Sequence, residues 1–113
     1  MSDEYIEKCL TYIRDKAEEY SKAVATHDHL KEFRKSKKAI LMQQAEREGV
    51  KTSASQEREA YAHPEYIELL DGLKVATEQK EYLRYMLKDS ELKLDVWRSL
   101  EATRRKEHTR YGN

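Results

Sequence analysis

The sequence predicts an all-α fold, an elongated antiparallel helical hairpin of the coiled-coil type with a short helix at its tip. Two long stretches, residues 2–48 and 64 to about 107, carry apolar residues at alternating three- and four-residue steps, which is the period of a helix packed along a seam. Gly49 is placed to end the first helix in a left-handed conformation, and Pro64 to begin the second. The two stretches are similar in length, so they can pair as a hairpin.

The seam of the first helix is formed by Ile6, Leu10, Ile13, Ala17, Tyr20 and Val24. The bend at 49–63 contains a short helix that ends at Ala62, with Ser53 or Ser55 as its N-cap. In the second helix, Lys80 and Ser90 interrupt the seam, and Gly72 costs about 1 kcal/mol relative to alanine unless it permits a close helix approach or a kink. The seam of this helix comprises Ile67, Leu70, Leu73, Ala76, Leu83, Leu87, Leu94 and Trp97.

We therefore expect one domain, 1–113, with a first arm at 1–48, a bend at 49–63, and a second arm with a basic tail at 64–113. A hairpin of two helices buries little core per residue, so self-association into a homo-oligomer is expected to supply part of the stability.

The single cysteine, Cys9, excludes an internal disulfide and suits a reducing compartment. The N-terminus lacks the apolar segment of a signal peptide, and no apolar run approaches the roughly 18 residues that cross a membrane. We expect a soluble protein of the cytoplasm with no membrane partner.

Charged residues make up 39% of the chain, yet the formal net charge is zero, which argues against a bulk polycation. The charge is unevenly distributed. Residues 31–51 carry seven Lys/Arg and three Asp/Glu, and residues 98–113 carry five and two. Two basic islands therefore stand in an acidic background.

The first island contains a stripe of four cations at i, i+3, i+4 and i+7, which share about 100° of one helix face. Such a stripe suits an anionic phosphate backbone. The alternative is a solvated face or salt bridges to acidic neighbours such as Glu78 and Glu81. The stripe consists of Lys31, Arg34, Lys35 and Lys38.

The second island either complements the negative end of the helix dipole or contacts nucleic acid. It consists of Arg98, Arg104, Arg105, Lys106 and Arg110. Arg47 and Lys51 flank Gly49 at the tip, where loop residues are free to contact a ligand.

Tyr82 and Tyr85 flank Arg84, a combination that can stack single-stranded bases, although packing at a helix interface is the commoner role of tyrosine and the one we predict. His27 and His29 point away from each other on a helix and cannot share a metal. No nucleophile elbow, P-loop or dinucleotide fingerprint is present. We expect neither an enzyme nor a cofactor or metal.

The order of these features resembles the UvsY-type recombination mediators of tailed phages. The resemblance spans about residues 25–105. It rests on Lys31-Glu-Phe-Arg-Lys-Ser-Lys-Lys38, on the stretch from Ala39 to Gly49 and on a short Glu-Arg-Glu helix. Ala62-His-Pro-Glu-Tyr-Ile-Glu-Leu-Leu70 and Val96-Trp-Arg-Ser-Leu-Glu-Ala-Thr-Arg-Arg105 complete it.

The resemblance implies a small oligomeric helical protein that binds single-stranded DNA in the bacterial host cell. Such a protein helps to load a recombinase onto strands covered by single-strand-binding protein. It also places DNA-contacting cations at Arg47 and Lys51, with Lys35, Lys37 and Lys38 upstream. The sequence departs from the family pattern at Gln43, Gln44 and Glu46, where further cations would be expected.

The favoured function is therefore a non-enzymatic accessory protein of phage recombination or replication. Its partners would be single-stranded DNA, a recombinase, single-strand-binding protein and further copies of itself. The alternative is a structural or adaptor coiled-coil protein that acts only through protein contacts, and salt-dependent DNA binding distinguishes the two.

Overall fold

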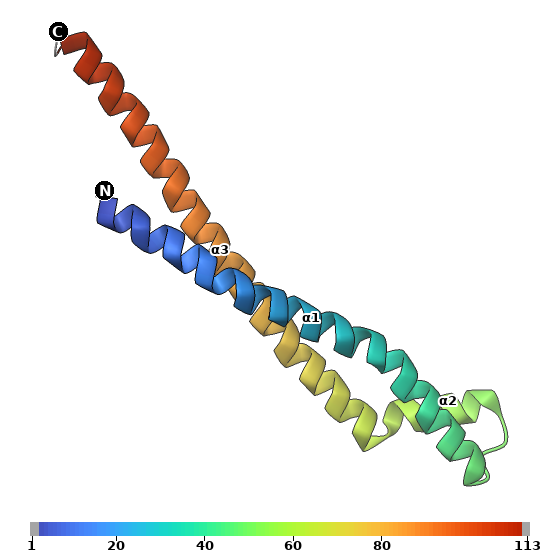
Figure 1. The fold of residues 1–113 in the computed structure, drawn as a ribbon. Helices are drawn as coiled ribbons and strands as arrows, with labels where there is room; N and C mark the ends of the chain where they lie inside the picture. The colour runs from blue at the N-terminus through green and yellow to red at the C-terminus, as the bar shows by residue number, and fades with distance from the viewer. Residues whose placement is uncertain (1–2, 112–113) are drawn as a thin grey trace. The chain divides into compact units, whose positions relative to one another are not determined.

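A computed structural model describes residues 3–111, which form three helices and no strand (Figure 1). These are α1 (Asp3–Arg47), α2 (Ser53–Ala62) and α3 (Pro64–Tyr111). The all-α helical hairpin is confirmed. α3 continues past the predicted end near Glu107, because no glycine or proline interrupts the sequence before Gly112.

The end of α1 has the geometry predicted for Gly49, whose φ is 101°. The Gly49 N–H donates to the Glu46 carbonyl at 3.1 Å, and the Val50 N–H donates to the Ala45 carbonyl at 3.0 Å. These two bonds form a Schellman motif, which satisfies carbonyls left open at the helix end.

The start of α2 differs from the prediction, because its N-cap is Thr52 rather than Ser53 or Ser55. Thr52 has extended backbone angles, and its hydroxyl accepts from the Ser55 N–H at 3.1 Å. Ser53 is already helical, so it cannot be the cap. The buried Gln56 side chain donates to the Val50 carbonyl at 2.8 Å, which fixes the connection from α1 to α2.

The passage from α2 to α3 takes a single residue, His63. Its carbonyl accepts from the N–H groups of Tyr66 and Ile67 at 3.0 and 3.1 Å, and its Nδ1 accepts from the Glu65 N–H at 3.0 Å. Pro64 occupies the first helical position, where no backbone donor is needed. The chain can therefore turn sharply while the donors at the start of α3 stay satisfied.

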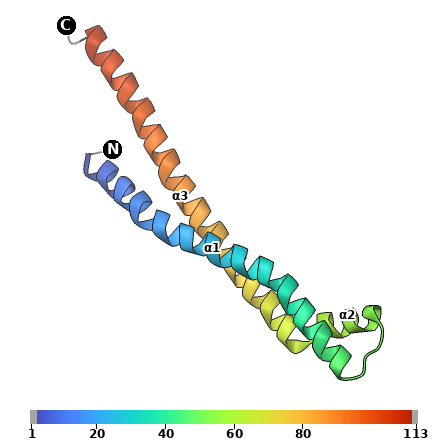
Figure 2. The same cartoon turned by 45° about the vertical axis from the view of Figure 1, so that its right-hand side comes forward.

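The chain divides into two compact units. One contains residues 22–80, where α1 and α3 run antiparallel (Figures 1 and 2). Lys37 of α1 forms an ion pair with Glu65 of α3, and the earlier residue His27 lies beside the later residue Lys80. The other contains residues 3–21 of α1 with 81–111 of α3. It is antiparallel too, since Lys16 interacts electrostatically with Tyr82, and Lys93 with Tyr5.

The core of unit 22–80 is a cluster of Leu41, Ala60 and Tyr66, with Met42 packed against it. The core of the other unit contains Cys9, Leu83 and Leu94, and also Ser90, which interrupts the apolar seam in the sequence.

The seam prediction is wrong for Leu10, Ile67 and Leu70, which are 40%, 48% and 38% exposed. At the start of α3, Leu41 packs against Tyr66 of α3 and Ala60 of α2. Because Tyr66 takes the buried position, the neighbouring Ile67 faces outward.

Within residues 3–111, no helix is both long enough and apolar enough to span a bilayer.

Candidate functional site

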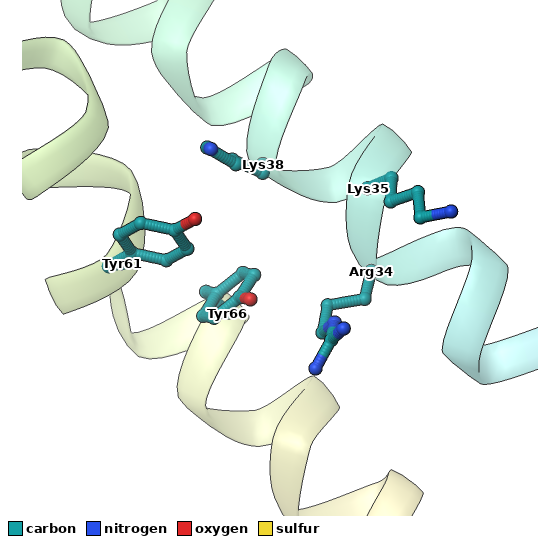
Figure 3. A pocket seen from close by; sticks show the side chains of 5 residues that line it. All are labelled: Arg34, Lys35, Lys38, Tyr61 and Tyr66. Atoms are coloured by element: carbon teal, nitrogen blue, oxygen red, sulfur yellow. The ribbon is translucent and has the colours of Figure 1, made fainter.

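Unit 22–80 contains a groove of about 590 Å³ that combines cations with aromatic rings (Figure 3). Three of its side chains come from one face of α1, and the other two come from the α2–α3 junction. We call it the basic–aromatic groove; it is lined by Arg34, Lys35, Lys38, Tyr61 and Tyr66.

The break at His63 brings the two tyrosines together. Tyr61 lies in the last turn of α2, and Tyr66 lies in the first turn of α3. Their rings meet edge to face, with centroids 5.3 Å apart and planes at 71°. Tyr66 is buried, whereas Tyr61 is 44% exposed. Tyr66 thus supports the Tyr61 ring from within, and Tyr61 offers aromatic surface to a ligand.

Lys38 is held by two neighbours on α2. Its Nζ lies 3.1 Å from Oε1 of Glu57 and 4.8 Å from the centroid of the Tyr61 ring. Interaction with Tyr61, and then with Glu57, raises the pKa of Lys38 above its ordinary value. Lys38 therefore stays protonated and fixes the orientation of the Tyr61 ring.

Arg34 and Lys35 have weaker interactions within the chain than Lys38. Within residues 3–111, Arg34 forms no ion pair. Lys35 lies 3.4 Å from Glu32, and both of these side chains are about 70% exposed. An exposed pair of this kind is worth at most about 1 kcal/mol, so an incoming anion can displace it. Figure 3 shows Lys38 directed toward Tyr61 and Arg34 toward α3, with Lys35 extending away from the rings.

The remaining first-island cations lie outside this groove. Lys31 is exposed and does not line it. Lys37 lies 2.9 Å from Glu65, and this contact lowers the pKa of the Glu65 carboxyl. Lys37 also borders a second cleft of about 370 Å³, whose other lining residues include Phe33 and Leu69.

The acidic partners of Lys37 and Lys38 differ from Glu78 and Glu81, which the salt-bridge alternative named as examples. The ion pairs are Lys37–Glu65 and Lys38–Glu57, while Glu81 binds Arg84 at 2.7 Å. The physical reason is the short helix α2, which brings Glu57 beside α1.

The predicted tip contacts, Arg47 and Lys51, are exposed on either side of Gly49 in the same unit as the groove, but they do not line it.

The predicted cations of the second island belong to the other unit. Arg98 lies 3.1 Å from Asp95, and Arg104 lies 2.6 Å from Glu101. Both are pairs within one helix, three residues apart. Arg105 is exposed.

The prediction that Tyr82 and Tyr85 pack at a helix interface is wrong for the chain as described. Their exposed fractions are 59% and 60%. The Arg84 guanidinium lies 4.6 Å from the centroid of the Tyr85 ring. The pKa of Arg84 is raised, and the largest cause is its hydrogen bond to Glu81.

The sequence analysis did not single out Tyr61 and Tyr66 as site residues. The available signal was the His63-Pro64 step between them, since a one-residue helix break places the end of one helix beside the start of the next.

No family model, no curated protein and no solved structure matches the chain. The resemblance to the UvsY-type mediators therefore stays a prediction, and the function has to be argued from the site.

Proposed function

We propose that the protein binds single-stranded DNA, without catalysing a reaction, and serves phage recombination or replication by helping to load a recombinase. The observation that carries the proposal is the basic–aromatic groove, where two loosely held cations lie beside an accessible tyrosine ring. Grooves of this composition bind single strands through phosphate contacts and base stacking.

The phosphate contacts come from Arg34 and Lys35. A guanidinium can donate two parallel hydrogen bonds to one phosphate, and an ammonium acts as a point charge. Each contact releases a counterion from the DNA, so binding weakens as salt rises.

The stacking contact comes from Tyr61. Lys38 and Tyr66 hold its ring, so little side-chain entropy is lost when a base stacks on it. Stacking on an aromatic side chain contributes about 1–3 kcal/mol per base. It requires an unstacked base, and the groove should therefore prefer a single strand to a duplex.

The mechanism is stoichiometric. A strand held by its backbone at intervals, on successive protein molecules, keeps the bases between those contacts available to a recombinase. The cations outside the groove, such as Lys31 and Lys37, Arg47 and Lys51 at the tip, and Arg98, Arg104 and Arg105 in α3, would add further phosphate contacts.

The alternative is an adaptor that acts only through protein contacts. One observation favours it: Lys37 and Lys38 are paired with Glu65 and Glu57 within the chain, as expected if the first basic island serves packing.

The test is fluorescence anisotropy of a labelled single-stranded oligonucleotide, with a duplex as control. The groove variant is Arg34→Gln/Lys35→Gln. Its matched control is Arg14→Gln/Lys74→Gln, which removes the same charge from two exposed cations outside the groove. The groove variant should bind at least about tenfold more weakly, since two phosphate contacts are lost, and the control should bind within about twofold of the original.

Equal affinities for the two variants would contradict the role of the groove. Absence of binding by the original chain at about 50 mM salt would instead favour the adaptor.

The loading step is tested separately, with a phage recombinase on strands covered by single-strand-binding protein. The protein should shorten the lag before strand exchange, and the groove variant should not. An unchanged lag would contradict the role in recombinase loading without contradicting DNA binding.

A further inference from the structure

One cation of the basic–aromatic groove is neutralised by a carboxylate from another helix. The Nζ of Lys38 lies 3.1 Å from Oε1 of Glu57 on α2. These two side chains are 30% and 45% exposed, whereas both partners of the Lys35–Glu32 pair are about 70% exposed. Water and salt screen the exposed pair more strongly. The charge of Lys38 is therefore offset more fully than that of Lys35.

Glu57 neutralises Lys38 without filling the groove. Lys38 lines the groove and Glu57 does not, so the carboxylate lies outside the space that a ligand would occupy. Lys38 also follows Arg34 by four residues on α1, which places both side chains on one face of the helix with their Cβ atoms about 5–6 Å apart. Figure 3 shows Lys38 directed toward the Tyr61 ring. A strand that contacts Arg34 and stacks on Tyr61 therefore passes beside Lys38.

We infer that Glu57 competes with DNA phosphate for Lys38 and thereby limits the affinity of the groove for a single strand. The inference rests on the proposed function of the groove. A lysine releases a counterion from DNA where its charge neutralises a phosphate. The charge of Lys38 is already neutralised, so a bound strand either lacks this phosphate contact or has to break the pair. In both cases the strand is held less tightly than a free Lys38 would hold it.

Lys38 has a second neighbour that keeps it in the groove when the charge of Glu57 is removed. Its Nζ lies 4.8 Å from the centroid of the Tyr61 ring, and interaction with Tyr61 is the largest cause of the raised pKa of Lys38, ahead of Glu57. Glutamine at position 57 has nearly the same shape as glutamate and keeps a carbonyl oxygen that can accept from Lys38. Glu57→Gln therefore changes the charge beside Lys38 while the side chains stay in place.

A limit on affinity suits a protein that passes its strand to a recombinase. The strand has to leave the groove during this transfer, and differences in affinity between related complexes arise mostly from the rate of dissociation. Neutralising one of the three groove cations within the chain leaves two, Arg34 and Lys35, to hold the phosphates.

The test is fluorescence anisotropy of a labelled single-stranded oligonucleotide with the original chain, Glu57→Gln and the matched control Glu59→Gln. Glu59 is exposed and does not line the groove. It lies two residues after Glu57 on α2, about 200° around the helix, so its substitution removes the same charge without freeing a groove cation. At about 100 mM salt, Glu57→Gln should bind about fivefold more tightly because one phosphate contact is added, and Glu59→Gln should bind within about twofold of the original.

The salt dependence identifies the cause of the tighter binding. Between about 50 and 200 mM salt, the slope of log K against log salt should be steeper by about 0.7 for Glu57→Gln and unchanged for Glu59→Gln. The Lys38–Glu57 pair is partly exposed and contributes little to stability, so the variant should remain helical, which circular dichroism checks.

Glu57→Gln binding that is unchanged or weaker, or a tightening equal to that of Glu59→Gln, overturns the inference while the groove still binds DNA. If the original chain fails to bind at about 50 mM salt, the proposed function fails, and the inference fails with it. The two failures are therefore distinguished by the original chain alone.

Discussion

Alanine substitutions at the two described glycines, Gly49 and Gly72, should change stability in opposite directions. Apart from the adjoining residues and, for Gly72, the backbone of its own helix, no atom lies within 4 Å of the place where a Cβ would stand at either position. Neither substitution therefore gains or loses a packing contact within the chain, and the difference between them isolates the conformation of the backbone.

The magnitude follows from the backbone angles. Gly49 has a φ of 101°, where a residue with a Cβ incurs about 1–2 kcal/mol of steric strain. Gly72 lies inside α3, where alanine is favoured over glycine by about 0.5–1 kcal/mol. Gly49→Ala should thus lower the free energy of unfolding by about 1 kcal/mol or more, and Gly72→Ala should raise it.

The assay is urea unfolding followed by circular dichroism, at one fixed protein concentration so that any self-association is held constant. The difference between the two variants should be about 2 kcal/mol. A destabilising Gly72→Ala would show that another backbone approaches α3 at this point. A neutral Gly49→Ala would show that the Schellman motif does not form.

Three further substitutions test the connections and the ion pair of unit 22–80. Gln56→Ala leaves the Val50 carbonyl without its side-chain donor and should cost about 1–3 kcal/mol in urea unfolding. Thr52→Ala removes the N-cap of α2 and should cost about 1 kcal/mol, whereas a change within about 0.2 kcal/mol would rule out the cap. Lys37 lowers the pKa of the Glu65 carboxyl in the folded chain. The pair therefore stabilises the fold fully at pH values above the unfolded-state pKa of glutamate, about 4.3. This stabilisation is lost as the pH falls through the lower pKa of the folded state. Lys37→Met should make thermal stability less dependent on pH in that acidic range, and an unchanged pH profile would contradict the assignment.

The end of α1 and the start of α3 could be predicted because they depend on local chemistry. Gly49 adopts a backbone conformation that other residues avoid, and Pro64 suits only the start of a helix. The cap of α2 was harder to assign, since Thr52, Ser53 and Ser55 all carry a hydroxyl that can accept from the backbone.

The contacts between helices could not be predicted from periodicity alone. α3 carries apolar residues on more than one face, and the sequence does not show which face meets α1. The sequence therefore predicted that Ile67 lies in the seam, whereas Tyr66 is the buried residue in the structure.

The candidate site could be predicted in part. The charged residues of the groove follow from the spacing of the cations in α1. Its aromatic residues depend on the angle between α2 and α3, which is a tertiary property. The pairing of Lys38 with Glu57 likewise depends on where α2 lies against α1.

The central claim is that Arg34 and Lys35 contact the phosphates of a single strand. The most direct test compares the salt dependence of single-strand binding for the original chain and for Arg34→Gln/Lys35→Gln between about 50 and 200 mM salt. Loss of two phosphate contacts should make the slope of log K against log salt shallower by about 1.4, while Arg14→Gln/Lys74→Gln leaves the slope unchanged. The same slope for all three proteins would show that the groove does not contact the DNA backbone.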